Sequence, residues 1–111
     1  MTQTNTLLHG TLDLLILKAV AGGPRHGYEI VRLIVARTAE TIAVEDGSLY
    51  PALYRLEKRG LIRGDWGISD AGRRARFYRL TDAGRRRLAE QTSEWLRFSE
   101  AVSSMVTGSQ I

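Results

Sequence analysis

The chain has 111 residues, no cysteine and a formal net charge of +4. This length suits a single domain, and the lack of cysteine excludes disulfide scaffolds, thiol catalysis and cysteine-ligated metal or redox centres. Hydrophobic residues make up 43% and charged residues 25% of the chain, which excludes the disordered and fibrous classes. Because residues 1–6 carry no basic side chain and no apolar run is long enough to cross a membrane, we expect a cytoplasmic protein without membrane contact.

The basic charge is concentrated in one part of the chain. Between Arg55 and Arg87 there are eleven Lys and Arg against four Asp and Glu, whereas the remaining residues hold five basic and eight acidic side chains. A basic segment of this kind is typical of a protein that binds a polyanionic partner. A basic segment also suits a face that is simply solvated, so charge alone does not decide between the two.

The first half of the chain predicts two helices. Apolar residues recur at helical spacing from Gly10 to Val20, which indicates a buried first helix. Gly22, Gly23 and Pro24 end this helix, because proline cannot continue the hydrogen-bond ladder. A second helix is predicted from about His26 to Thr38, with its apolar residues on one inner face.

A third helix and a hairpin follow. Asp46 is a suitable N-cap for a helix that runs to about Arg59 and carries leucines at helical spacing. After Gly60, the β-compatible segments Leu61–Trp66 and Arg76–Leu80 are separated by glycine and aspartate, which predicts a two-stranded hairpin with a long loop.

The last helix is predicted to pair with another helix. Thr81 caps it, and Asp82 lies in its first turn, where a negative charge is favourable. Its apolar seam follows a heptad spacing over Leu88, Gln91, Trp95, Phe98, Val102 and Met105. Since its own domain leaves nothing to cover this seam, we expect a partner helix.

This order of elements predicts the fold class. Three helices followed by a hairpin is the layout of the winged helix-turn-helix, whose third helix enters the major groove of DNA. We therefore predict a mainly α fold with a small β-hairpin. Residues 1–80 would form a winged helix-turn-helix DNA-binding domain, and residues 81–111 one long C-terminal dimerisation helix.

Two groups of residues are candidates for DNA contact. On the third helix, hydroxyls, rings and charges suited to base edges and phosphates come from Ser48, Tyr50, Pro51, Tyr54, Arg55 and Lys58. At the hairpin tip, Arg73, Arg74 and Arg76 would neutralise phosphates. Alternatives stay open: the two tyrosines could flank the core with their hydroxyls in water, and the arginines of residues 85–87 could merely solvate the last helix.

Five stretches in this order resemble the PadR-family transcriptional regulators. They are Leu8–Leu17, His26–Ile30 (HGYEI), Gly47–Glu57 (GSLYPALYRLE), Arg59–Ile62 (RGLI) and Tyr78–Gly84 (YRLTDAG). No single stretch is specific, but the combination is, and the likeness extends from Leu7 to Trp95. The resemblance implies a homodimeric winged-helix regulator, usually a repressor, that binds double-stranded DNA at a pseudopalindromic operator.

The resemblance also implies roles for individual residues. Tyr28 would contact a backbone phosphate, and Gly47–Glu57 would be the recognition helix. Where the family often has proline before this helix, the chain has Glu45 and Asp46, which would put an acidic group near the phosphate backbone. With one C-terminal helix the chain is similar to the short subfamily, in which last and first helices pair between subunits.

Trp95 is similarly placed to a tryptophan that stacks planar aromatic ligands in some drug-sensing members of this subfamily. The tryptophan could instead only pack the dimer core, and Gln91 could register the helix pair or face a cavity. An effector, if one exists, would be a planar aromatic or phenolic compound. The residues expected at the dimer interface or effector cavity are Leu8, Leu12, Leu88, Gln91, Trp95, Phe98 and Val102.

Other function classes have less support in the sequence. The two histidines, His9 and His26, have no metal-binding spacing, and no phosphate-binding glycine loop occurs, so we expect neither an enzyme nor a cofactor or metal site. A histidine at a helix start, such as His26, is expected to be structural. The main rival is a winged helix that binds protein or RNA without a specific DNA operator. The arginines of the hairpin favour nucleic acid, and a two-fold dimer would favour duplex DNA.

Overall fold

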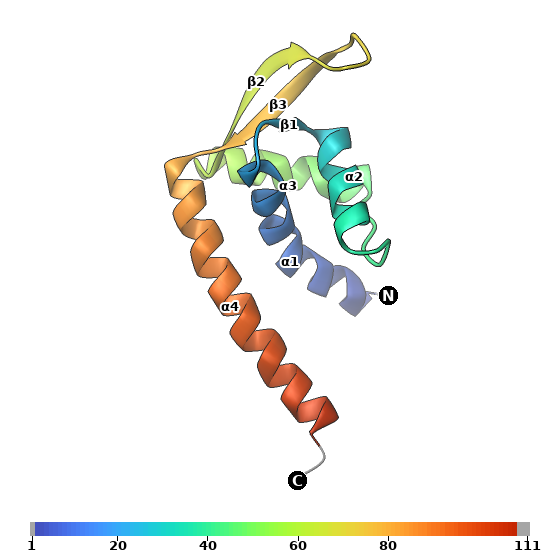
Figure 1. The fold of residues 1–111 in the computed structure, drawn as a ribbon, viewed down its shortest axis with the longest axis vertical. Helices are drawn as coiled ribbons and strands as arrows, with labels where there is room; N and C mark the ends of the chain where they lie inside the picture. The colour runs from blue at the N-terminus through green and yellow to red at the C-terminus, as the bar shows by residue number, and fades with distance from the viewer. Residues whose placement is uncertain (1, 109–111) are drawn as a thin grey trace.

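The computed structural model describes the backbone of residues 2–108 and the side chains of residues 10–108, and within them the chain forms four helices and three strands. The elements are α1 (Thr2–Ala21), β1 (Arg25–His26), α2 (Gly27–Arg37), α3 (Asp46–Lys58), β2 (Ile62–Ile68), β3 (Arg74–Leu80) and α4 (Asp82–Thr107). The first three helices form a compact group, the strands project from one end of it, and α4 extends away as a long rod (Figure 1). None of the helices in this part of the chain has the length and apolar character needed to cross a membrane.

The sheet has one strand more than the sequence predicts. Its order is β1-β3-β2, with both pairs antiparallel, and β1 joins through Arg25 and His26 opposite Tyr78 and Phe77. The hairpin is also longer than expected, because β2 and β3 stay paired out to Ile68 and Arg74. We call β2, β3 and the connecting turn of residues 69–73 the wing.

The core lies where α1, α2 and α3 meet the base of the wing, as the helical spacing predicts. Its fully buried side chains are Leu12, Ile16, Leu17, Val20, Ile30, Leu49, Leu53, Leu56 and Ile62. Burial on this scale is the main favourable contribution to folding. One prediction is wrong here: Leu12, expected at the dimer interface, is fully buried inside its own domain and is not exposed to a partner.

The start of α2 shows a cap that the sequence analysis did not predict, and the start of α3 corrects one that it did. His26 and Glu29 form a capping box at the start of α2, in which each side chain accepts a backbone N–H of the other residue. This contact supports the structural role expected for His26. At α3 the N-cap is Glu45 rather than Asp46, and it makes no side-chain capping bond. Asp46 is instead the first helical residue, where its charge still meets the positive end of the helix.

Thr81 joins the wing to α4, as its predicted capping role requires. Its hydroxyl accepts a hydrogen bond from the Gly84 amide at 3.0 Å and lies 2.7 Å from the Gly60 carbonyl oxygen, to which it donates. Its backbone N–H donates to the carbonyl of Leu61 at 3.1 Å. At Gly84 the start of α4 comes so close to the Leu61 carbonyl that a Cβ would overlap it. The direction in which α4 leaves the wing is therefore set by direct contacts.

Candidate nucleic-acid interface

The third helix divides its residues cleanly between the core and solvent. Leu49, Leu53 and Leu56 are buried, whereas the side chains of Tyr50 and Tyr54 are 52% and 66% exposed. Both tyrosines thus have exposed surface on the outer side of α3, which fits DNA contact and equally fits the alternative in which they flank the core with their hydroxyls in water. Of the other predicted residues on the exposed side, Pro51 is exposed and Ser48 is half-buried. The outer face of α3 presents rings and hydroxyls, which suits contact with base edges and the sugar-phosphate backbone.

The wing and the starts of α2 and α3 enclose a cleft, which we call the recognition cleft. It has a volume of about 910 Å³ and is lined mainly by Tyr28, Arg32, Tyr50, Trp66, Arg73 and Arg74. Tyr28 is exposed, and the guanidinium of Arg32 lies 5.6 Å from the centre of its ring. Arg76 also lines the cleft, and Asp70 is the acidic residue among the lining residues. Cationic and aromatic groups therefore dominate its surface.

Gly27 lets α2 and α3 come together at the floor of this cleft. A Cβ added at Gly27 would lie 2.8 Å from the hydroxyl oxygen of Tyr50 and 3.3 Å from two of its ring carbons. Only a residue without a side chain leaves room for the tyrosine in this position. The glycine of the HGY stretch thus sets where Tyr50 lies.

Replacing Gly27 with alanine is expected to displace Tyr50 with little loss of stability. The tyrosine ring is half exposed and can turn into solvent, so we expect the midpoint of thermal unfolding to change by less than about 4 °C. Affinity for DNA should fall about threefold to tenfold if Tyr50 contacts it. Fluorescence anisotropy with a labelled duplex measures this effect. Gly22→Ala, whose Cβ would make only an ordinary 3.6 Å contact with Arg25, is the matched control, and equal affinities of the two variants would contradict the prediction.

The tip of the wing carries two of the three predicted arginines. The turn closes through hydrogen bonds between Ser69 and Arg73, and Gly72 takes the positive φ of 78° that the turn needs. Arg73 and Arg74 are both exposed. Within residues 10–108 neither has an acidic partner within ion-pair distance. Their charges are therefore free to neutralise phosphates.

Arg76 does not lie at the tip, contrary to the sequence prediction. Its guanidinium reaches back to α3 and donates a 2.5 Å hydrogen bond to Glu57, whose carboxylate also accepts the Gly64 amide at 3.3 Å. Gly64 provides the space, since a Cβ there would meet the Arg76 guanidinium. The hydrogen bond to Glu57 raises the pKa of Arg76 above its ordinary value, and burial raises the pKa of the neighbouring Tyr78. Arg76 thus serves first as a link between the wing and α3.

The cations of α3 are also partly engaged. Arg55 forms a 3.0 Å ion pair with Asp13 of α1, which directs its charge toward the first helix. The ammonium group of Lys58 lies 5.8 Å from the centre of the Tyr54 ring. Of these two predicted phosphate contacts, Lys58 is the one that shares a surface with the exposed tyrosines.

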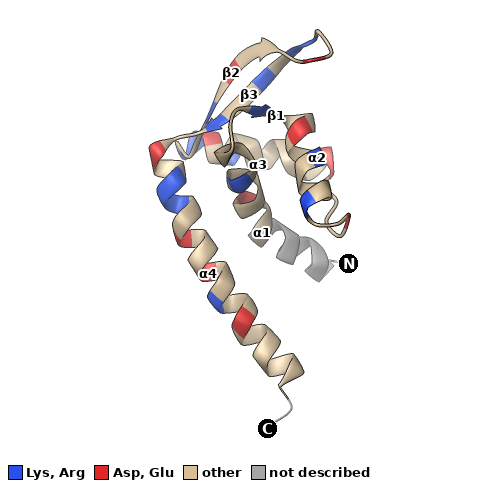
Figure 2. Ribbon diagram, in the orientation of Figure 1, with Lys and Arg blue, Asp and Glu red and all other residues tan. Residues whose placement is uncertain are grey.

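Charge colouring of the ribbon shows basic residues along the wing and at the start of α4, with acidic residues interspersed farther along α4 (Figure 2). At the start of α4, Arg85 lies 3.8 Å from Asp82, and Arg87 lies 3.2 Å from Glu90. These are short-range pairs on an exposed helix, which contribute little to stability. The arrangement supports the interpretation of the arginines of residues 85–87 as a solvated face.

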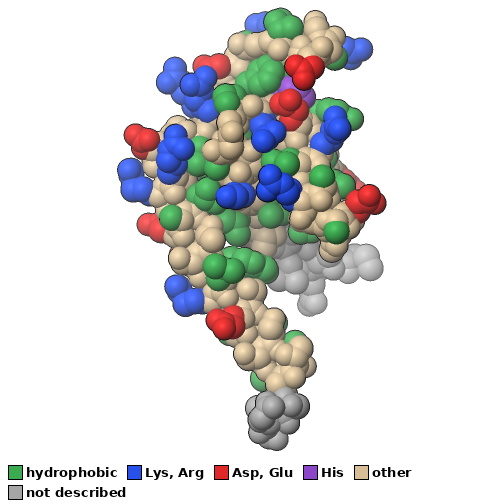
Figure 3. Space-filling model, viewed as in Figure 1, with side chains coloured by type: hydrophobic (Ala, Val, Ile, Leu, Met, Phe, Trp, Pro, Cys, Tyr) green, Lys and Arg blue, Asp and Glu red, His purple; other side chains and the backbone are tan. Residues whose placement is uncertain are grey.

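The distal part of α4 exposes an apolar face. Hydrophobic side chains gather midway along this helix in the space-filling view (Figure 3). The exposed residues of the predicted seam are Trp95, Phe98, Val102 and Met105. The Trp95 and Phe98 rings are 6.2 Å apart, whereas Leu88 packs against the core of its own domain. We call Trp95, Phe98, Val102 and Met105 the α4 seam. A lone chain leaves such a surface in water, which is typical of a face used for association.

A small pocket of about 170 Å³ lies between α1 and the α4 seam. Its lining residues are Gly10, Thr11, Leu14, Gln91, Glu94, Trp95 and Phe98. The structure thus brings together Gln91, Trp95 and Phe98, as predicted. The side chain of Leu8, which was expected in the same place, lies outside the described residues.

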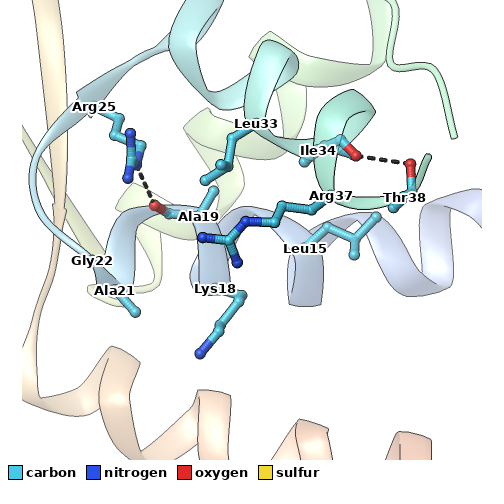
Figure 4. A pocket seen from close by; sticks show the side chains of 10 residues that line it. All are labelled: Leu15, Lys18, Ala19, Ala21, Gly22, Arg25, Leu33, Ile34, Arg37 and Thr38. Carbon is cyan, nitrogen blue, oxygen red and sulfur yellow. Dashed lines mark hydrogen bonds between the residues drawn. The ribbon is translucent and has the colours of Figure 1, made fainter. Parts of the chain in front are cut away.

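A second pocket, which no sequence pattern predicted, lies between α1 and α2 (Figure 4). Its volume is about 280 Å³, and apolar side chains such as Leu15 and Leu33 line it beside Lys18, Arg25 and Arg37. Arg25 donates to the Ala19 carbonyl at 2.8 Å, and Arg37 extends along α1 toward Lys18. Helical spacing placed Lys18 and Arg37 on helices but could not show that these two cations and Arg25 come together, because the three belong to different elements.

Comparison with known proteins places these features in one family. Residues 16–90 match the model of the Transcriptional regulator PadR-like family. A transcriptional regulator of Mycobacterium tuberculosis is 37% identical over 86 residues, which are 78% of this chain and 63% of that longer protein. An uncharacterized protein of Lysinibacillus sphaericus is 34% identical over 92% of this chain and 94% of its own length.

Solved structures share the fold over almost the whole chain. A transcriptional regulator from Clostridium thermocellum superposes with a TM-score of 0.82 at 30% identity, covering 91% of this chain and 98% of its own. A PadR-like transcriptional regulator from Bacillus cereus gives a TM-score of 0.79 at 30% identity, covering 94% and 99%. The winged helix with one long C-terminal helix is therefore confirmed as the architecture.

Proposed function

The chain belongs to the PadR-like family of transcriptional regulators, and from this premise we propose that it is a homodimeric repressor that binds a pseudopalindromic DNA operator. One observation carries the proposal: Tyr28 of α2, Tyr50 of α3 and the wing arginines Arg73 and Arg74 line one recognition cleft. A helix and a wing on one side of a domain can contact a groove and the adjacent phosphates together. We place this activity in the cytoplasm.

In this proposal the two parts of the chain have separate tasks. Residues 1–80 bind DNA, and residues 81–111 hold two subunits together through the α4 seam. Pairing of the seams would remove the exposed apolar face from water, which favours association. Two recognition helices related by a two-fold axis would then meet half-sites about 34 Å apart, one turn of duplex DNA.

A mobility-shift assay tests the proposal. The full chain is titrated against duplex DNA from upstream of its own gene, with scrambled duplex as competitor and over a series of salt concentrations. A shift that survives the competitor and a footprint with two-fold symmetry support an operator-binding dimer. Equal binding to both duplexes that disappears at modest salt supports instead a winged-helix module without an operator.

Reversing the charge of Arg74 is expected to weaken binding to every DNA sequence. A phosphate contact contributes affinity without sequence information, so Arg74→Glu should reduce affinity for specific and scrambled duplex alike, by about tenfold to a hundredfold at low salt. Anisotropy titrations of both duplexes measure this loss. Arg63→Glu is the matched control on the same wing, because Arg63 lies 3.9 Å from Asp65 and is not among the lining residues of the recognition cleft. Unchanged affinity of Arg74→Glu would refute the phosphate contact.

We also propose that a planar aromatic compound releases the protein from DNA by binding beside Trp95. The pocket there, at about 170 Å³, is smaller than the roughly 300 Å³ or more that a drug-sized ligand needs. A site of adequate size therefore requires the partner subunit. Adding planar aromatic and phenolic compounds to the mobility-shift assay tests this: release by one compound, lost in Trp95→Ala, supports it. If no compound acts, Trp95 only packs the dimer.

A further inference from the structure

Trp66 was not among the residues expected to act in DNA binding, yet it lies at the centre of the wing's cleft-facing side. Its side chain is 58% exposed. Trp66 is directly opposite Arg76 in the β2–β3 register, and Arg74 is diagonal to it. Residues paired across an antiparallel ladder share one face, and so do residues two apart in a strand. The indole and both arginines therefore lie together on the face that lines the recognition cleft.

The two arginines use this ring differently. The guanidinium carbon of Arg74 lies 4.4 Å from the centre of the indole, and that of Arg76 lies 5.9 Å away. Both distances are within the range of a cation–π contact, and the shorter one is typical of close stacking. Arg76 donates a hydrogen bond from its guanidinium to Glu57 of the recognition helix. Arg74 makes no hydrogen bond or ion pair with another described side chain. Stacking on the Trp66 ring therefore leaves the N–H donors along the edge of its guanidinium available for another partner.

We propose that Trp66 is a positioning residue that holds the Arg74 guanidinium in the recognition cleft, ready for a DNA phosphate. An arginine side chain in solvent samples many rotamers and loses this freedom when it binds. A guanidinium already stacked on an aromatic ring has lost part of that freedom and keeps its planar donor edge for a phosphate. Trp66 therefore raises affinity for DNA without touching it.

The same contacts connect Trp66, Arg74 and Arg76 to the recognition helix. Glu57 of α3 holds Arg76, Arg76 lies against the ring of Trp66, and Trp66 carries Arg74. The wing contact is thus placed relative to α3, the element that reads the groove. This explains why Arg76, predicted as a phosphate contact, is turned away from the tip: its partner is a carboxylate of the protein.

A double-mutant cycle on DNA binding tests the inference, which rests on the proposed function. Wild type, Trp66→Ala, Arg74→Ala and the double variant are titrated against the operator duplex and against a scrambled duplex at low salt. We expect Arg74→Ala to weaken binding about threefold to tenfold and to reduce the slope of log affinity against log salt by about 0.9, the loss of one phosphate. Trp66→Ala should have a smaller effect of the same kind, and the double variant should bind no more weakly than Arg74→Ala alone.

Two further variants separate positioning from a structural role. Trp66→Phe keeps an aromatic face and should bind within about twofold of wild type, because a phenyl ring also stacks a guanidinium. Trp66→Leu keeps apolar volume without a π face and should behave as Trp66→Ala does, which covers the case in which the alanine variant unfolds. Additive losses in the double variant, or a Trp66→Leu variant that binds like wild type, would overturn the inference.

The outcomes also distinguish the inference from the proposed function. The phosphate contact does not depend on sequence, so the cycle can be read on the scrambled duplex even if no operator exists. Coupling between Trp66 and Arg74 on both duplexes without discrimination between them would support the inference and refute operator binding. Specific binding by the wild type together with additive losses in the cycle would support operator binding and refute the inference about Trp66. A wild type that binds neither duplex would refute both the inference and the proposed function.

Discussion

Gly84→Ala is expected to lower the free energy of unfolding by about 3 kcal/mol, a large effect for the addition of one methyl group. The added Cβ would overlap the carbonyl oxygen of Leu61 and lie 2.7 Å from a methyl group of Leu80. The Leu61 carbonyl is held in place, because the backbone N–H of Thr81 donates to it at 3.1 Å. Relief of the overlap therefore breaks the junction between the wing and α4.

Urea unfolding at a fixed protein concentration measures this loss, since the stability of a dimer depends on concentration. Gly47→Ala is the matched control. It also lies near the start of a helix, but a Cβ there would meet nothing within 4 Å, so alanine should leave stability unchanged or raise it by up to about 1 kcal/mol. Equal unfolding midpoints for the two variants would show that the junction tolerates a side chain.

Phe98→Glu is expected to convert the proposed dimer into monomers and to reduce affinity for the proposed operator by about a hundredfold or more. Phe98 is 57% exposed in the single chain and is a member of the α4 seam, so the substitution leaves the monomer fold unaltered. In a paired seam it would bury a carboxylate without a partner, which is strongly unfavourable. Two linked half-site contacts would then become one.

Sedimentation at micromolar concentration gives the mass, and circular dichroism confirms that the helices persist. Ser93→Glu is the control, because Ser93 is exposed and lies on the opposite side of α4 from Trp95 and Phe98. A Phe98→Glu variant with the mass of the wild type would contradict the assignment of the α4 seam to dimerisation.

Much of the fold follows from local patterns. Helical spacing predicted the buried faces of α1, α2 and α3, and the capping preference of threonine predicted the start of α4. The wing was expected from β-compatible segments, but its length was underestimated because Gly67 was assigned to a loop. In the structure Gly67 stays in β2 beneath the ring of Phe77, which would lie 3.0 Å from a Cβ there.

The features that the sequence did not reveal depend on residues far apart in the chain. A two-residue strand such as β1 has no pattern of its own and exists only because β3 offers an edge. A count of basic residues could not show that Arg76 is paired with Glu57, nineteen positions away, while Arg74 has no acidic partner among the described residues. Nor could it show that Trp66 lies under both arginines. The charge of the wing was predictable, but its division into anchored and available cations required the structure.

Because the junction at Thr81 fixes α4 to the wing, a tilt of α4 would move the DNA-binding domain with it. The 26 residues of α4 span about 39 Å at 1.5 Å per residue, and its first turn is fixed to the wing. In a dimer held through the α4 seam, whose centre lies about 27 Å along the helix from its first residue, a tilt of about 7° between the rods would move one DNA-binding domain relative to the other by about 3 Å. A shift of this size is comparable to the rise of one base pair, about 3.4 Å. A change small enough to come from repacking a few side chains around Trp95 would then put the two recognition helices out of phase with their half-sites.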